Sequence, residues 1–239
     1  MARKQPAPAR LTLRVLARLL TYPDAELRAH IPDLLSALLQ EQALDPARLH
    51  ELRALCQQLT HMDRYAAEER YVETFDRGRQ CSLLLFEHVH GDSRERGEAL
   101  VDLMKTYESA GLQFAANELP DYLPAVLEFA STQEPALARA FLGETAHILN
   151  ALFTALVDRG SPYASVVAAV LEVAGEAPQR VEIEPEPDLD ESWAEPPAFD
   201  GMQMAGQSQP GQRRHKKAPE IRYVQDEPSP TQTPEGAAS

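Results

Sequence analysis

The side chains that could carry out chemistry are concentrated in one short segment, Cys81–Arg96. Within it, His88, His90 and Asp92 spell H-x-H-x-D, the first ligands of a pattern used by metal-dependent hydrolases. That pattern needs a further histidine directly after the aspartate, where this chain has Ser93. On a helix, residues two apart point about 200° away from each other and could not share an ion. A metal-dependent hydrolase therefore remains only as the alternative function.

Cys81 and Ser82 are the candidate nucleophiles of the same segment. No G-x-S-x-G elbow surrounds Ser82, and no cationic neighbourhood is evident around Cys81. A buried cysteine usually behaves as a small hydrophobic residue. The residues therefore give nucleophilic catalysis little support.

Recognition is the third interpretation of this segment. We predict that Cys81–Phe86 forms an apolar helix, which Glu87–Arg96 follows as an exposed, charged turn. Donors and acceptors grouped at the end of a core helix are typical of a peptide groove. An ordinary helix–turn–helix corner with solvated charges would produce the same sequence. The residues alone support these two interpretations equally.

The elements that must position this segment are predicted to be helices throughout residues 11–175. Apolar side chains recur at helical spacing, and no alternating strand pattern or Asn-Gly hairpin signal occurs. A single helix is expected from Pro135 to Arg159. The residues expected to begin or divide the other helices are Asp24, Pro32, Asp45-Pro46, Asp92 and Ser161-Pro162, and the expected glycine ends are Gly111, Gly160 and Gly175.

Composition limits the function classes. The chain has 239 residues, with 23 Lys and Arg against 37 Asp and Glu, for a net charge of −14. Such an acidic balance disfavours general nucleic-acid binding and suits a partner of basic peptides. No run approaches the ~20 apolar residues of a spanning helix, so no direct membrane insertion is expected. The two cysteines imply no disulfide framework, which favours a reducing, cytoplasmic location.

The predicted domain organisation has three parts. Residues 1–10 form a flexible N-terminus, residues 11–175 an all-helical domain, and residues 176–239 an acidic, Pro-rich and largely disordered tail. Two prolines in 118–124 indicate a hinge inside the helical domain. In the tail, Trp193 and Phe199 are predicted either to dock onto a surface or to stay exposed.

Three segments of the sequence resemble those of a known protein family. They are Tyr71–Asp76, Cys81–Arg94 with its Glu-His-Val-His-Gly-Asp-Ser-Arg core, and Glu118–Pro124. In order and spacing they resemble the nitrate reductase molybdenum cofactor assembly chaperones, within the redox-enzyme maturation chaperone family. The match covers residues 10–175. The resemblance implies an all-α helical bundle, no enzyme activity and no cofactor of its own. It also implies a protein that is absent from the mature reductase.

The partner that this resemblance implies is the N-terminal peptide of the apo catalytic (alpha) subunit, held until the molybdenum cofactor is inserted. Molybdenum cofactor biosynthesis proteins are further implied partners. Relatives can exchange halves between protomers, so a monomer or a domain-swapped dimer is expected. Residues 118–124 would then act as the hinge of such an exchange.

The peptide site is expected to combine carboxylates for basic residues with an apolar groove. Tyr71, Phe75, Leu83 and Tyr122 are predicted as groove walls. Core packing is the alternative for each aromatic and is favoured for Phe75 and for Phe86, which is left out of the set. Because imidazoles gain a proton near neutral pH, binding should depend on pH. The full predicted set is Tyr71, Phe75, Asp76, Leu83, Glu87, His88, His90, Gly91, Asp92, Arg94, Asp121 and Tyr122.

Overall fold

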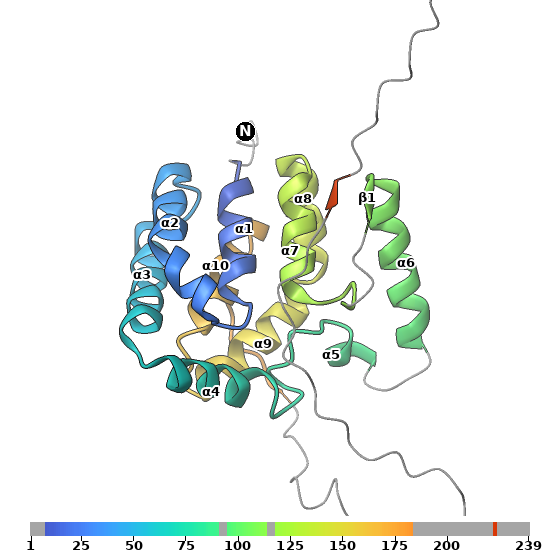
Figure 1. The fold of residues 1–239 in the computed structure, drawn as a ribbon. Helices are drawn as coiled ribbons and strands as arrows, with labels where there is room; N and C mark the ends of the chain where they lie inside the picture. The colour runs from blue at the N-terminus through green and yellow to red at the C-terminus, as the bar shows by residue number, and fades with distance from the viewer. Residues whose placement is uncertain (1–7, 91–94, 114–117, 184–221, 224–239) are drawn as a thin grey trace, which may run out of the picture.

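A computed structural model describes residues 8–90, 95–113, 118–183 and 222–223. Within them the regular secondary structure is almost wholly helical, which confirms the predicted all-α class (Figure 1). The helices are α1 (Arg10–Leu19), α2 (Ala25–Glu41), α3 (Pro46–His61), α4 (Arg64–Phe75), α5 (Glu87–His90), α6 (Glu95–Ser109), α7 (Leu123–Thr132), α8 (Pro135–Glu144), α9 (Ala146–Asp158) and α10 (Ala164–Ala174).

The core forms around α1 and α10. Helix α1 packs against α7, α2 and α10, while α10 packs against α9, α8 and α3. Every residue from Val166 to Leu171 is fully buried, as are Leu16 and Leu19 on α1. Burying one of these valine or leucine side chains contributes about 1.5–3 kcal/mol. The apolar sequence of α10 therefore places this helix at the centre of the bundle.

Several helices begin or end at the residues that the sequence analysis predicts. The Asp24 side chain accepts a hydrogen bond from the Leu27 N–H at 2.8 Å at the start of α2. Helix α3 begins at Pro46 directly after Asp45, which forms no side-chain cap. At the end of α10, Gly175 adopts a φ of 83°, a left-handed conformation that favours glycine.

Two predicted helix boundaries are wrong. Pro32 does not divide α2, which runs unbroken past it, because the buried Leu27, Ile31 and Leu38 hold one face of the helix against the core. The helix expected from Pro135 to Arg159 is two helices, α8 and α9, bent by 66° at Thr145. There the Thr145 hydroxyl donates to the Leu142 carbonyl oxygen at 2.8 Å, a local bond that competes with helix continuation.

Membrane-spanning character is weak in the described residues. No single helix there has the length and apolar composition to cross a bilayer. Only the bent pair α8–α9 meets both criteria when its two helices are taken together.

The apolar run before α5 is also not a helix, contrary to prediction. Leu84 forms an antiparallel bridge with Tyr122. Beside it, the Leu85 N–H donates to the Asp121 carbonyl at 3.0 Å and the Leu123 N–H to the Leu83 carbonyl at 2.8 Å. Leu83 and Leu85 are buried while Leu84 is only half-buried, the alternation of an extended strand. Backbone pairing with residues 121–123, far away in the sequence, therefore determines the extended conformation of this segment.

Helix α6 stands beside the bundle rather than inside it (Figure 1). Its single buried residue is Tyr107, which joins Leu112 and Phe129 in a small separate core. Strand β1 (Leu112–Gln113) follows and pairs antiparallel with β2 (Arg222–Tyr223). Residues 118–122, part of the predicted hinge, form the loop that returns the chain to α7.

Candidate functional site

A group of polar side chains meets where the segment before α5, the start of α6 and the loop before α7 come together. We call this group the polar corner: Ser82, Glu87, His88, Arg96 and Asp121. Its members come from parts of the chain up to 39 residues apart, and hydrogen bonds or ion pairs join them.

Asp121 lies at the centre of the polar corner with no exposed surface. Its Oδ2 accepts a hydrogen bond from the Phe86 N–H at 3.0 Å and lies 3.9 Å from an Arg96 guanidinium nitrogen. Burial raises the pKa of this carboxyl, while the Phe86 bond and the Arg96 charge act in the opposite direction. Asp121 therefore acts mainly as an internal anchor for the backbone around Phe86.

Arg96 links Asp121 to Glu87, the second carboxylate of the corner. An Arg96 guanidinium nitrogen lies 3.4 Å from Glu87 Oε1, and the Ser82 hydroxyl donates to Glu87 Oε2. Glu87 keeps 22% of its side chain exposed, whereas Asp121 keeps none. Of the two carboxylates, only Glu87 is therefore open to a ligand from solvent.

His88 and His90 point to different partners. The His88 Nε2 is 2.8 Å from the Ser82 carbonyl oxygen. The His90 ring packs edge-on against Phe86, with Nδ1 3.8 Å from a Glu95 carboxylate oxygen. The described residues contain no group of three histidine, cysteine, aspartate or glutamate side chains placed to hold a metal ion. The two imidazoles thus occupy separate environments.

The aromatic residues predicted as groove walls lie in the core. Tyr71, Phe75 and Leu83 are 6%, 5% and 5% exposed, and Tyr122 is half-buried against the same cluster. The Tyr71 hydroxyl donates to the Leu20 carbonyl oxygen at 2.8 Å, and its ring lies 4.8 Å from that of Phe75. In this conformation these side chains pack against the protein's own helices.

The remaining predicted residues fall into two groups. Asp76 follows α4 and is exposed, close enough to Tyr71 and Tyr122 for its charge to help raise the pKa of both phenols, burial being the main cause. Gly91, Asp92 and Arg94 lie outside the described residues.

Sequence reasoning missed several features. Arg96 and Ser82 were not in the predicted peptide-site set, although both bond to Glu87. Two adjoining hollows between α3 and the α9–α10 turn, with volumes of 460 and 620 Å³, were also missed. Each joins residues far apart in sequence, so no local motif marks them.

Comparison with known proteins identifies the family. The profile of the nitrate reductase delta subunit family matches residues 23–169. The chain is 42% identical over 167 residues to the nitrate reductase molybdenum cofactor assembly chaperone NarJ of Escherichia coli (strain K12), covering 70% of this chain and 71% of that protein. A Bacillus subtilis (strain 168) protein named "Probable nitrate reductase molybdenum cofactor assembly chaperone NarJ" is 35% identical, with 67% and 86% covered.

A solved structure titled "Crystal Structure Of A Putative Redox Enzyme Maturation Protein From Archaeoglobus Fulgidus" is also similar, with a TM-score of 0.49 and 19% identity over 70% of this chain and 94% of that one. The sequence matches define a maturation chaperone, not a catalytic enzyme. The chain belongs to the nitrate reductase delta subunit family. Nothing in these comparisons supports a metal-dependent hydrolase.

Proposed function

We propose that this chaperone binds the N-terminal region of a cofactor-free nitrate reductase catalytic subunit. It holds that subunit competent for molybdenum cofactor insertion and assembly, and it then leaves. The observation that carries the proposal is the 42% identity to NarJ over 71% of that chaperone's length. We place this activity in the cytoplasm, in keeping with the free, buried thiols of Cys56 and Cys81.

We assign the peptide to the surface formed by α5 and α6, beside the polar corner. Val89 on α5 is 51% exposed, and on α6 Val101 and Met104 are 52% and 40% exposed. Val101 and Met104 lie three residues apart and so share one face of the helix. Exposed apolar side chains on an outlying helix suit the apolar face of an amphipathic peptide.

Charge on the same surface favours a basic peptide. Among the described residues of α5 and α6, the acidic side chains are Glu87, Glu95, Glu98, Asp102 and Glu108, against the basic Arg96 and Lys105. Arg96 is already paired with Glu87 and Asp121, and Lys105 with Asp102. The remaining carboxylates would steer and pair with lysine or arginine of the client. His88 and His90 border this surface and remain part of the proposed site.

The client is tested by a pull-down with the full chain from cells that accumulate cofactor-free reductase. We expect the catalytic subunit to be recovered, and recovery to fall when a synthetic peptide of its N-terminal region is added. If the catalytic subunit is absent from the bound fraction, the proposed function is wrong.

The surface is tested separately by peptide titration. Val101→Glu with Met104→Glu should weaken binding at least about tenfold, equivalent to 1.4 kcal/mol. Leu137→Glu on α8 is the matched control, because Leu137 is 56% exposed and lies outside the α5–α6 surface. Equal affinity in both variants would show that the peptide binds elsewhere, without affecting the identity of the client.

A further inference from the structure

The polar corner holds more negative than positive charge. Its carboxylates are those of Asp121 and Glu87, and its guanidinium is that of Arg96. The His88 Nε2 lies 2.8 Å from the Ser82 carbonyl oxygen, a neutral acceptor. With both carboxyls ionised and His88 neutral, the corner carries one net negative charge, although Asp121 has no exposed surface. Because a buried charge is costly unless it is paired, the corner favours a further cation.

Two buried atoms of the corner lack hydrogen-bond partners. They are the Arg96 Nε and the Asp121 Oδ1, neither of which is bonded within the described part of the chain. The two ion pairs of Arg96 are also loose: its guanidinium nitrogens lie 3.4 Å from Glu87 Oε1 and 3.9 Å from Asp121 Oδ2. Well-formed bonds between such groups measure about 2.7–2.9 Å. Arg96 therefore satisfies the two carboxylates only in part.

Arg96 also fastens the start of α6. It is the second residue of this outlying helix, and its side chain is only 16% exposed. The other ion pair at this end joins His90 to Glu95 at 3.8 Å, with the Glu95 side chain 82% exposed. Near the opposite end, Tyr107 is the single buried residue of the helix. Release of Arg96 would therefore free the start of α6 while Tyr107 still holds its end.

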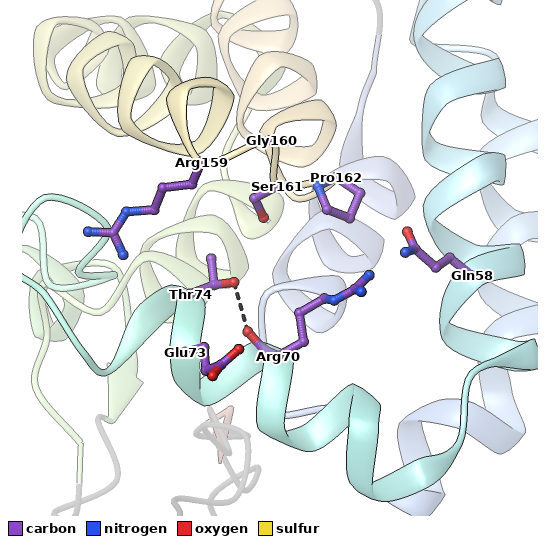
Figure 2. Close-up of a pocket in the computed structure, with 8 residues that line it drawn as sticks. All are labelled: Gln58, Arg70, Glu73, Thr74, Arg159, Gly160, Ser161 and Pro162. Atoms are coloured by element: carbon purple, nitrogen blue, oxygen red, sulfur yellow. Dashed lines mark hydrogen bonds between the residues drawn. The ribbon is translucent and has the colours of Figure 1, made fainter.

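The hollow of 460 Å³ next to α4 shows a different arrangement of charge. Figure 2 shows Arg70 and Arg159 extending away from each other along its lining, so their guanidinium groups do not converge. The carboxylate in that lining, Glu73, pairs with Arg77 at 3.5 Å. In the polar corner, by contrast, charged side chains from three segments meet. Of these two places, the polar corner is the one with the geometry of a single ion site.

We propose that a lysine or arginine side chain of the client replaces Arg96 at Glu87 and Asp121. This inference rests on the proposed function and names the group of the client that the polar corner takes. Arg96 is then a resident cation, which occupies the corner until the client arrives. Glu87, with 22% of its side chain exposed, meets the incoming cation first. The exchange frees the start of α6 and so couples the polar corner to the α5–α6 surface.

The first test is a titration of two full-length variants with a synthetic peptide of the catalytic subunit's N-terminal region. Arg96→Gln and Lys105→Gln each remove one positive charge from α6, but Lys105 is 67% exposed and pairs with Asp102 outside the corner. Because Arg96 competes with the client, Arg96→Gln should bind the peptide at least about threefold more tightly than Lys105→Gln. Equal or weaker binding by Arg96→Gln would overturn the proposal.

The second test changes the peptide. Each lysine or arginine of the peptide is replaced in turn by glutamine, and each product is titrated against both variants. We expect one replacement to weaken binding and to remove the advantage of Arg96→Gln, because the competing cation is then absent from both partners. If no replacement changes the ratio of the two affinities, the polar corner does not take a side chain of the client.

The third test uses the wild-type chain and so does not depend on the folding of a variant. The amides of Ala99 and Leu100 close the first turn of α6. Added peptide should speed their hydrogen exchange while the amide of Tyr107 stays protected. Slower exchange of Ala99 and Leu100 in a chain that binds the peptide would overturn this inference alone. If the wild-type chain does not bind the peptide, the proposed function is wrong and the inference falls with it.

Discussion

The buried carboxylate of Asp121 accepts a hydrogen bond from the backbone N–H of Phe86, 35 residues earlier, at 3.0 Å. The carbonyl of the same residue accepts another from the Leu85 N–H at 3.0 Å. Asp121 thus holds the segment before α5 with both its side chain and its main chain. The position of Glu87, the partly exposed carboxylate of the polar corner, depends on this contact.

Replacing Asp121 should therefore destabilise the fold. Asp121→Ala removes the acceptor of the Phe86 N–H and the partner of Arg96, and should lower the free energy of unfolding by about 2–3 kcal/mol. Urea unfolding measures this loss. The control is Asp102→Ala, whose 74% exposed carboxylate pairs with Lys105 and should contribute less than about 0.5 kcal/mol. Equal losses in the two variants would contradict the anchoring role of Asp121.

Glu128 on α7 should make stability depend on pH. Burial raises the pKa of its carboxyl from 4.5 to about 7, although Arg14 and Arg18 lower it. Between these values the folded chain binds a proton that the unfolded chain has released. The contribution of this group is therefore present at acidic pH and is lost as the pH rises through about 7.

Glu128→Gln is the variant that isolates this effect. Relative to wild type, it should gain more stability near about pH 8 than near about pH 5, because only at the higher pH does the folded wild type carry the buried charge. Urea unfolding at the two pH values measures both differences. A stability difference that is the same at both would show that Glu128 titrates normally in the folded chain.

Two neighbouring tyrosines should respond differently to loss of the hydroxyl. The Tyr163 hydroxyl is buried with no hydrogen-bond partner in the described part of the chain, whereas the Tyr71 hydroxyl donates to Leu20. Tyr71→Phe should lower the free energy of unfolding by about 1–2 kcal/mol, and Tyr163→Phe should leave it unchanged or raise it. The rings lie 6.0 Å apart in one cluster, so each variant controls for the packing of the other. Equal destabilisation by the two substitutions would contradict this difference in hydrogen bonding between the Tyr71 and Tyr163 hydroxyls.

Tyr107 should determine how firmly α6 is attached. Its ring lies 4.6 Å from that of Phe129, and its hydroxyl donates to the Pro120 carbonyl at 2.8 Å. Tyr107→Ala should speed hydrogen exchange in α6 while leaving α10 protected, because the two helices belong to different cores. Tyr107→Phe keeps the ring and should have a smaller effect. Faster exchange throughout the bundle would show that α6 is part of one cooperative unit.

Local patterns predicted most of the helices but not all of their boundaries. Apolar spacing and the Asp24 cap identify α1 and α2, because both signals are local. The break at Thr145 carries no strong breaker residue, and the tolerance of Pro32 depends on core packing, so neither was predictable. Cys81–Phe86 is too short for periodicity to separate a strand from a helix, and its partner Tyr122 is far away in sequence.

The candidate site was predictable only in part. Resemblance pointed to Glu87 and Asp121, and the structure brings these two together through Arg96. The predicted aromatic walls pack in the core, since sequence alone does not distinguish a groove wall from a core residue. The exposed pair Val101 and Met104 was missed, because only the three-dimensional fold shows that α6 lies outside the bundle.

The bridge between Leu84 and Tyr122 has a consequence for how the chain can vary. The backbone leaves the bundle at this point, forms α5 and α6, and returns to the same point, so the excursion behaves as an insert. The entropy cost of closing such a loop rises by only about 0.6 kcal/mol for each doubling of its length. The length and surface of helix α6 can therefore change at little entropic cost to the folding of the bundle.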